Sequence, residues 1–79
     1  METTADKIKI GQKTVVKALA CKGALRRRII DMGIIPGVQI ILRKRAPFGD
    51  PLEFIVRGYR LCIRKSEACQ IIVSTEGDR

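Results

Sequence analysis

Histidine and tryptophan are absent from this chain of 79 residues, and aromatic side chains are scarce. Histidine is the commonest general base near neutral pH and the commonest transition-metal ligand, so its absence removes a component of most hydrolytic and metal-dependent mechanisms. The acidic residues are scattered, and no Cys-His pair is available to activate a nucleophile. The sequence therefore predicts a protein that is not an enzyme, with no catalytic residue, no cofactor, no metal site and no small-molecule substrate.

The cysteines are few and odd in number, at Cys21, Cys62 and Cys69, and no Cys-x-x-Cys pair occurs. Neither a zinc knuckle nor a closed disulfide framework fits this spacing. Reduced and mostly buried thiols are expected instead. Because Cys62 alternates with Leu61 and Ile63 along a predicted strand, its thiol is the one that can point outward.

Long apolar runs are also missing, and residues 1–9 carry charges without an apolar centre. The sequence therefore predicts neither a transmembrane span nor a signal peptide, and a cytoplasmic protein is expected. A chain of this length forms one small domain. We expect that domain to span residues 8–74, with flexible tails at 1–7 and 75–79.

Positive charge is in excess, with 16 lysines and arginines against eight acidic residues and a net charge of +8. Eight of the basic residues fall between positions 7 and 30, where no acid occurs. Such a surface favours anionic partners, either nucleic acid, an anionic membrane or an acidic protein surface. Nucleic acid is the less favoured of these, because the aromatic side chains that stack on bases are scarce.

Hydrophobic periodicity predicts mainly β structure with one helix inserted early. Residues 13–19 have strand character, and within 24–32 the apolar residues Leu25, Ile29 and Met32 recur on one helix face. Gly33 follows as the expected helix stop. Strands are then predicted at 38–45, 52–56, 60–64 and 70–74, with a proline-rich loop at 47–51, a reversal at 58–59 and one helical turn at 65–68 that Ser66 caps.

The segment 23–37, GALRRRIIDMGIIPG, resembles the central motif of the ferrous iron transport protein A (FeoA) family. The later segments PFGDP at 47–51, VRGY at 56–59 and LCIRKSEA at 61–68 resemble its closing pattern in order and spacing. Ile29 stands where the family often has leucine, which is an apolar exchange of similar volume.

The resemblance covers residues 11–73 and implies a fold and a role. The fold is mainly β, a small SH3-like barrel of about five strands with a helical insertion after the first strand. The role is that of a cytosolic accessory to the FeoB-type ferrous iron permease, a membrane protein with a cytosolic guanine-nucleotide-binding domain.

Six residues are candidates for contact with a partner: Arg26, Arg27, Phe48, Asp50, Ile41 and Ile55. The two arginines project from the helix and suit bidentate contact with carboxylates, although a solvated helix face explains them equally well. Phe48 lies at a loop tip, where it either anchors a partner or folds over the barrel end. Ile41 and Ile55 form an apolar patch if their strands pair, unless the inserted helix covers that face.

The neighbouring Arg28 lies beside the apolar stripe of the predicted helix, so an internal bond to a carbonyl or carboxylate is expected for it. The resemblance, together with the basic surface and the missing catalytic groups, implies a non-enzymatic adaptor that binds and modulates a FeoB-type permease at the cytosolic membrane face, with the nucleotide-binding domain of the permease as one candidate contact. Weak self-association through the apolar patch is a further expectation. A stand-alone basic barrel that binds nucleic acid or associates with the ribosome is the alternative.

Overall fold

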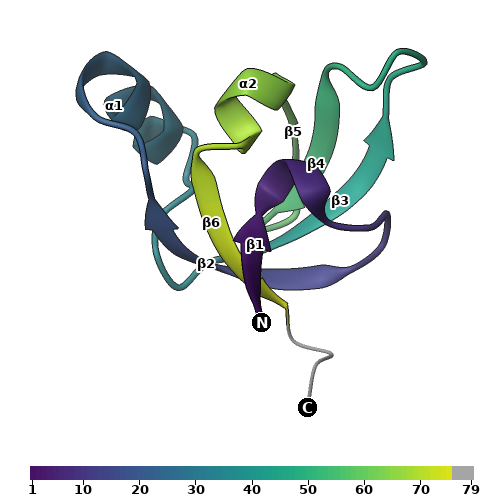
Figure 1. Cartoon of the computed structure of the whole chain (residues 1–79), viewed down its shortest axis with the longest axis horizontal. Helices are drawn as coiled ribbons and strands as arrows, with labels where there is room; N and C mark the ends of the chain where they lie inside the picture. Colours follow the sequence, from purple (N-terminus) through teal and green to yellow (C-terminus); the bar gives the residue numbers. More distant parts are fainter. Residues whose placement is uncertain (76–79) are drawn as a thin grey trace.

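The computed structural model describes residues 1–75 and consists of one strongly curved antiparallel sheet with two α-helices (Figure 1). The strands lie in the order β1-β6-β2-β3-β4-β5. The elements along the chain are β1 (Glu2–Thr4), the 3-10 helix η1 (Ala5–Lys7), β2 (Lys13–Leu19), α1 (Gly23–Asp31), β3 (Gln39–Arg45), β4 (Leu52–Val56), β5 (Tyr59–Ile63), α2 (Lys65–Ala68) and β6 (Ile71–Thr75).

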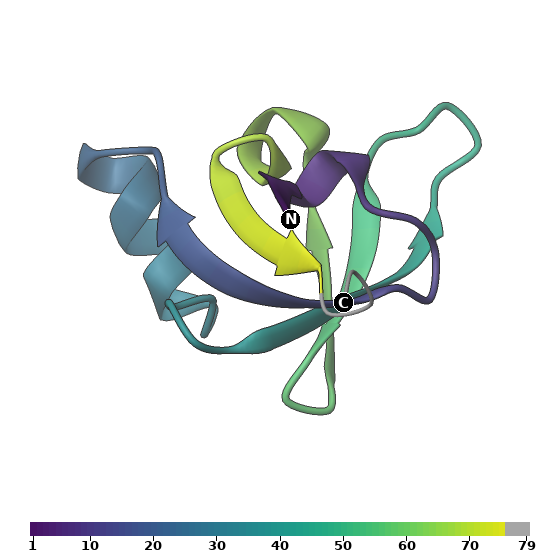
Figure 2. The ribbon, with the colours of Figure 1, turned by 60° about the horizontal axis from the view of Figure 1, so that its bottom comes forward.

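The sheet curves because two of its ladders are irregular. The pairing of β2 with β6 shifts between Val16 and Ala18, and that of β3 with β4 shifts between Leu42 and Lys44. An extra residue of this kind bends a strand and increases its twist. The sheet therefore rolls into an SH3-like half barrel whose two edges, β1 and β5, do not pair with each other (Figure 2).

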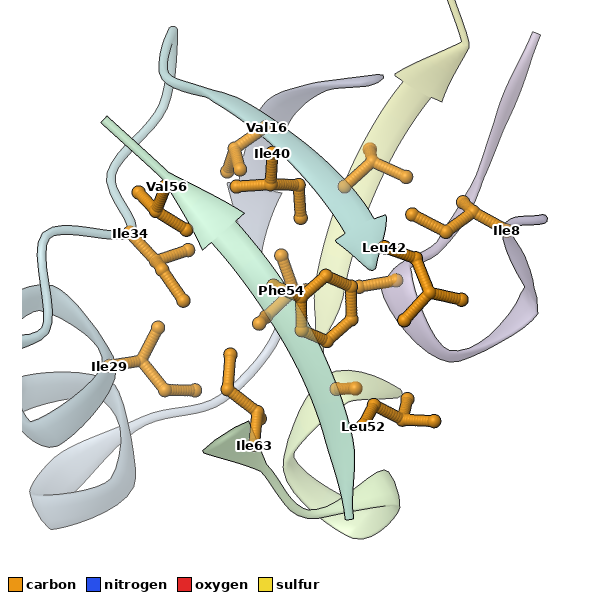
Figure 3. Packing of buried hydrophobic residues seen from close by; sticks show 14 of the residues in the cluster. Ile8, Val16, Ile29, Ile34, Ile40, Leu42, Leu52, Phe54, Val56 and Ile63 are labelled. Atoms are coloured by element: carbon orange, nitrogen blue, oxygen red, sulfur yellow. The ribbon is translucent and has the colours of Figure 1, made fainter. Parts of the chain in front are cut away.

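The inner face of the rolled sheet carries the core, which is almost entirely aliphatic (Figure 3). In β3 and β4 the buried residues alternate with more exposed ones, as expected for strands with one face in the core. Phe54 lies at the centre and is fully buried, while Ile29 reaches the core from α1 and lies close to Ile63. The inserted helix thus completes the core at the open end of the barrel.

The predicted end of the helix is confirmed in detail. Gly33 has φ of 93°, and its N–H donates to the carbonyl of Ile30 at 2.9 Å, while the N–H of Ile34 donates to the carbonyl of Ile29 at 3.3 Å. This pair of bonds is a Schellman motif, in which the residue after the glycine packs against the last turn. Ile29 and Ile34 are both fully buried, so the motif fixes the helix and the core together.

Some of the expected boundaries are wrong. Residues 2–4 form β1, which pairs with β6, and Ala5 is fully buried, so the segment 1–7 is not a frayed tail and the domain does not begin at residue 8. The sheet accordingly has six strands, and the helix follows the second. The predicted tail from 75 onward also begins too early, because Thr75 belongs to β6; positions 76–79 lie outside the described residues.

Two local predictions also need correction. The reversal between β4 and β5 is made by Arg57 and Gly58, one residue earlier than expected, and both have positive φ, at 52° and 84°. These values define a type I′ turn, the type that suits a two-residue hairpin. Ser66 is not the cap of α2, because Arg64 occupies the N-cap position.

Replacing Ile29 with alanine should lower the free energy of unfolding by about 2–5 kcal/mol, because the change leaves a cavity in the aliphatic core. Ile30 is 37% exposed and supplies the matched control. Ile30→Ala should change the free energy by no more than about 0.5 kcal/mol. Chemical denaturation followed by circular dichroism measures both, and equal effects of the two changes would contradict the assigned helix face.

Candidate protein-binding surfaces

The outer face of α1 carries the first candidate surface. Arg26, Arg27 and Ile30 are exposed there and, with Gly23, line a shallow hollow. Among residues 1–75 the side chain of Arg26 makes a single long contact, from Nη1 to the carbonyl oxygen of Leu19 at 3.5 Å. Two guanidinium groups beside an accessible apolar side chain are thus available to a partner that carries both carboxylates and apolar groups.

Arg28 points to the other side of the helix and makes the internal bond expected of it. Its Nη1 lies 2.9 Å from Oε2 of Glu67, whose side chain is only 9% exposed. The other carboxylate oxygen, Oε1, accepts a hydrogen bond from the N–H of Arg64 at 3.1 Å. Glu67 therefore ties α1 to the beginning of α2, and this arrangement separates Arg28 in function from Arg26 and Arg27.

The β3-β4 loop carries the second candidate surface, and Phe48 at its tip is 98% exposed. The loop is closed by hydrogen bonds from Ala46 N–H to the carbonyl of Pro51 at 3.1 Å and from Gly49 N–H to the carbonyl of Ala46 at 2.7 Å. Phe48 does not fold back over the barrel end. An aromatic side chain held outward on a hydrogen-bonded loop has the properties of an interface anchor.

Asp50 has an intramolecular role in this loop. Its Oδ1 accepts a hydrogen bond from the N–H of Lys65 at 2.8 Å. That N–H belongs to the first turn of α2, where backbone donors have no partner within the helix. Asp50 therefore caps α2 from a distance and holds the Phe48 loop against it.

The third candidate surface lies on the outside of the sheet, where Ile41 and Ile55 are direct cross-strand partners in β3 and β4. Both are partly buried, and neither belongs to the core or packs against it. Helix α1 directs Ile29 to the inner face instead, so the two isoleucines form a small apolar pair on the outer face. Lys13 and Arg60 flank this pair in the same row of the sheet.

The structure does not bring the six candidate residues into one site. In both overall views α1 and the β3-β4 loop lie on opposite sides of α2, while Ile41 and Ile55 occupy the outer sheet surface (Figures 1 and 2). The sequence did not indicate that Glu67 connects α1 to α2. Its spacing of three from Arg64 is a capping signal, but its pairing with Arg28 depends on the tertiary fold.

Within 1–75 no group of three or more His, Cys, Asp or Glu side chains is arranged to hold a metal ion. None of the helices in that range has the length and apolar character needed to cross a membrane. Cys62 is exposed and Cys69 partly exposed, so only Cys21 meets the expectation of buried thiols.

Comparison with known proteins agrees with this architecture. The FeoA domain family model matches residues 3–75. The chain is 30% identical over 63 residues to the Fe(2+) transport protein A/Fe(2+) transporter FeoB fusion protein of Porphyromonas gingivalis, and the match covers 80% of this chain. The matched region is only 8% of the length of that fusion protein.

Solved structures of FeoA proteins superpose on this chain. The FeoA-like protein of Clostridium acetobutylicum superposes with a TM-score of 0.88 at 37% identity, covering 95% of this chain and 87% of that one. The FeoA of Stenotrophomonas maltophilia, solved with zinc and described as a prokaryotic SH3 domain protein, gives 0.80 at 25% identity, covering 91% and 89%.

The rolled sheet and inserted helix thus define a small SH3-like domain linked to ferrous iron transport. The chain belongs to the FeoA family.

Removing the Asp50 carboxylate should loosen the loop without disturbing the core. Asp50→Ala is expected to lower the free energy of unfolding by about 0.5–2 kcal/mol, the usual effect of losing a side chain that caps a helix. Amide hydrogen exchange of Lys65 should become faster in the same variant. Asp50→Asn keeps an oxygen acceptor and serves as the control, so identical exchange in Asp50→Ala and wild type would refute the capping role.

Proposed function

We propose that this protein is a non-enzymatic adaptor of ferrous iron uptake, which binds a FeoB-type permease on its cytosolic side and modulates it. The observation that carries the proposal is the fused relative, in which a transport protein A and a FeoB transporter form one polypeptide. Two domains that are fused in one protein and separate in another commonly act on one another. The high effective concentration in the fusion replaces the affinity that a separate chain must supply.

The surfaces of the domain suit an acidic partner. Arg26 and Arg27 are exposed on α1, and no carboxylate within residues 1–75 forms an ion pair with either of them. Complementary charge speeds association and selects the partner more than it adds affinity. Phe48 supplies the apolar anchor that such an interface requires. The adaptor role needs no catalytic group, which agrees with the residue types in the chain.

Reversing the charge of α1 should weaken this binding. In Arg26→Glu/Arg27→Glu, the affinity for the permease in detergent is expected to fall at least tenfold at low salt, and less at high salt because ions screen the attraction. Isothermal titration against both the full permease and its isolated cytosolic domain measures the effect. Binding to the full protein alone would locate the contact at the membrane, and binding to the isolated domain would locate it near the nucleotide site.

Lys7→Glu/Lys9→Glu is the matched control, because it makes the same change in net charge at exposed residues away from α1. Both double variants should keep the wild-type thermal midpoint. If both double variants lose the same affinity, the loss comes from the change in net charge, and α1 does not form part of the interface. Absence of binding by the wild-type protein to either form of the permease, together with strongly salt-dependent retention on nucleic acid, would support the nucleic-acid function instead.

The exposed aromatic side chain gives an independent test. Phe48→Ala should leave the free energy of unfolding within about 0.5 kcal/mol of wild type, since the ring contributes nothing to the core. The affinity for the permease should fall more than tenfold, as for an anchor residue. Ile10, which is 60% exposed, is the control position, and Ile10→Ala should bind normally. Unchanged affinity in Phe48→Ala would exclude the loop tip from the contact.

A further inference from the structure

Strand β5 forms an open edge of the sheet, and its backbone is arranged to pair with another strand. Val56 and Tyr59 flank the two-residue type I′ turn, so they form a hydrogen-bonded pair, and such pairs alternate along an antiparallel ladder. Arg60 and Cys62 fall between the bonded pairs. Their N–H and C=O groups therefore point away from β4, toward the free edge.

No other part of the described chain covers these groups. Within residues 1–75 neither the backbone N–H nor the backbone C=O of Arg60 or Cys62 has a hydrogen-bond partner outside the β4-β5 ladder. Both residues are exposed. The other edge, β1, is only three residues long, whereas β5 has five. Natural sheets usually protect an edge of this kind, because it serves as a template for a further strand.

The charged residues within β5 and in the segments on either side of it in the sequence are all positive. From position 57 to 65 there are four basic residues, Arg57, Arg60, Arg64 and Lys65, and no acidic residue. All four are exposed, and none of them forms an ion pair with another described residue. Three carboxylates lie beside this stretch, and each is already bonded. Glu53 pairs with Arg43, Glu67 pairs with Arg28 and accepts the N–H of Arg64, and Asp50 accepts the N–H of Lys65.

The two faces of β5 differ in a way that specifies the pattern of an added strand. Leu61 faces inward and packs against the core, and Tyr59, on the same face, is 72% exposed. Arg60 and Cys62 face outward, and Cys62 borders a hollow that Arg28 and Arg64 also line. An incoming strand would thus place one set of alternate side chains on apolar groups and the other set on guanidinium groups.

We propose that the β5 edge binds an extended acidic segment of a partner protein by strand addition. The segment alternates apolar residues, which contact Leu61 and Tyr59, with acidic residues, which contact Arg60 and Arg64. Main-chain hydrogen bonds to Arg60 and Cys62 supply affinity, and the side-chain alternation supplies specificity. A second copy of this chain fits less well, because each copy carries a net charge of +8.

The probe is a capped octapeptide of alternating valine and glutamate, titrated into the full-length protein labelled with ¹⁵N. The amides of Arg60 and Cys62 should shift and their hydrogen exchange should slow, whereas that of Leu61, already bonded to β4, should change little. The same peptide N-methylated on the residues that face β5 should bind at least tenfold more weakly. A peptide of alternating valine and lysine should not bind.

Protein variants separate charge from backbone pairing. Arg60→Gln keeps the N–H and loses the charge, so it should weaken binding by about two- to fivefold, the range of one exposed charge pair. Arg60→Pro also removes the outward N–H and should weaken binding at least tenfold. Each variant is first checked for cooperative unfolding. If the proline variant does not fold, the N-methylated peptide alone tests whether binding depends on backbone hydrogen bonds.

Equal binding of the N-methylated and parent peptides, or peptide shifts confined to α1, would overturn the inference. So would self-association in sedimentation velocity that Arg60→Pro abolishes, because the edge would then belong to a second copy. The inference rests on the proposed function only for the identity of the partner. Peptide failure with intact permease binding would refute the edge site alone, whereas peptide binding without permease binding would refute the adaptor role alone.

Discussion

The buried carboxylate of Glu67 is the interaction on which the arrangement of the helices depends. One oxygen accepts the N–H of Arg64 and the other pairs with Arg28, so a single side chain both caps α2 and joins it to α1. A buried carboxylate is costly unless both oxygens are satisfied, and here both are. α2 is only four residues long and cannot persist by its own hydrogen bonds. Its position is therefore set by bonds to other elements, from Glu67 to Arg28 of α1 and from Lys65 to Asp50 of the β3-β4 loop.

This constraint has consequences for function. The bond from Asp50 to the backbone of Lys65 fixes the β3-β4 loop to α2, and the pair formed by Arg28 and Glu67 fixes α1 to the same short helix. The exposed ring of Phe48 and the guanidinium groups of Arg26 and Arg27 thus lie on two flanks of α2, to which both of their elements are bonded. A partner that contacts both flanks meets a preformed surface, and binding does not have to order either flank.

Much of the fold follows from local sequence signals, and the rest depends on pairing between distant residues. The stripe of Leu25, Ile29 and Met32 and the glycine after it predict α1 and its end, because both signals lie within a few residues of each other. β1 has no such signal. Its residues are polar, and it is a strand only because β6, about seventy positions later, offers them an edge.

The candidate surfaces divide in the same way. The outward thiol of Cys62 follows from strand alternation, which is local. Loop composition placed Phe48 at a tip but left open whether the ring is exposed, as it is in the structure. The capping role of Asp50 does not, because its donor lies 15 residues away on another element. The open edge at β5 could not be predicted either, because hydrophobic periodicity shows that a segment is a strand but not which other strands pair with it. Which strand lies at the edge is settled by the order of the whole sheet.

The fold also explains why so small a domain presents so much positive charge. Three of its eight acidic residues are used internally: Glu67 holds α1 to α2, Glu53 holds Arg43 across two strands, and Asp50 caps α2. These three acids are therefore not available as counter-charges for Arg26, Arg27 or Arg60. Arg26 and Arg27 of α1 and Arg60 of β5 form no ion pair with another residue of 1–75, so a partner with carboxylates can neutralise them.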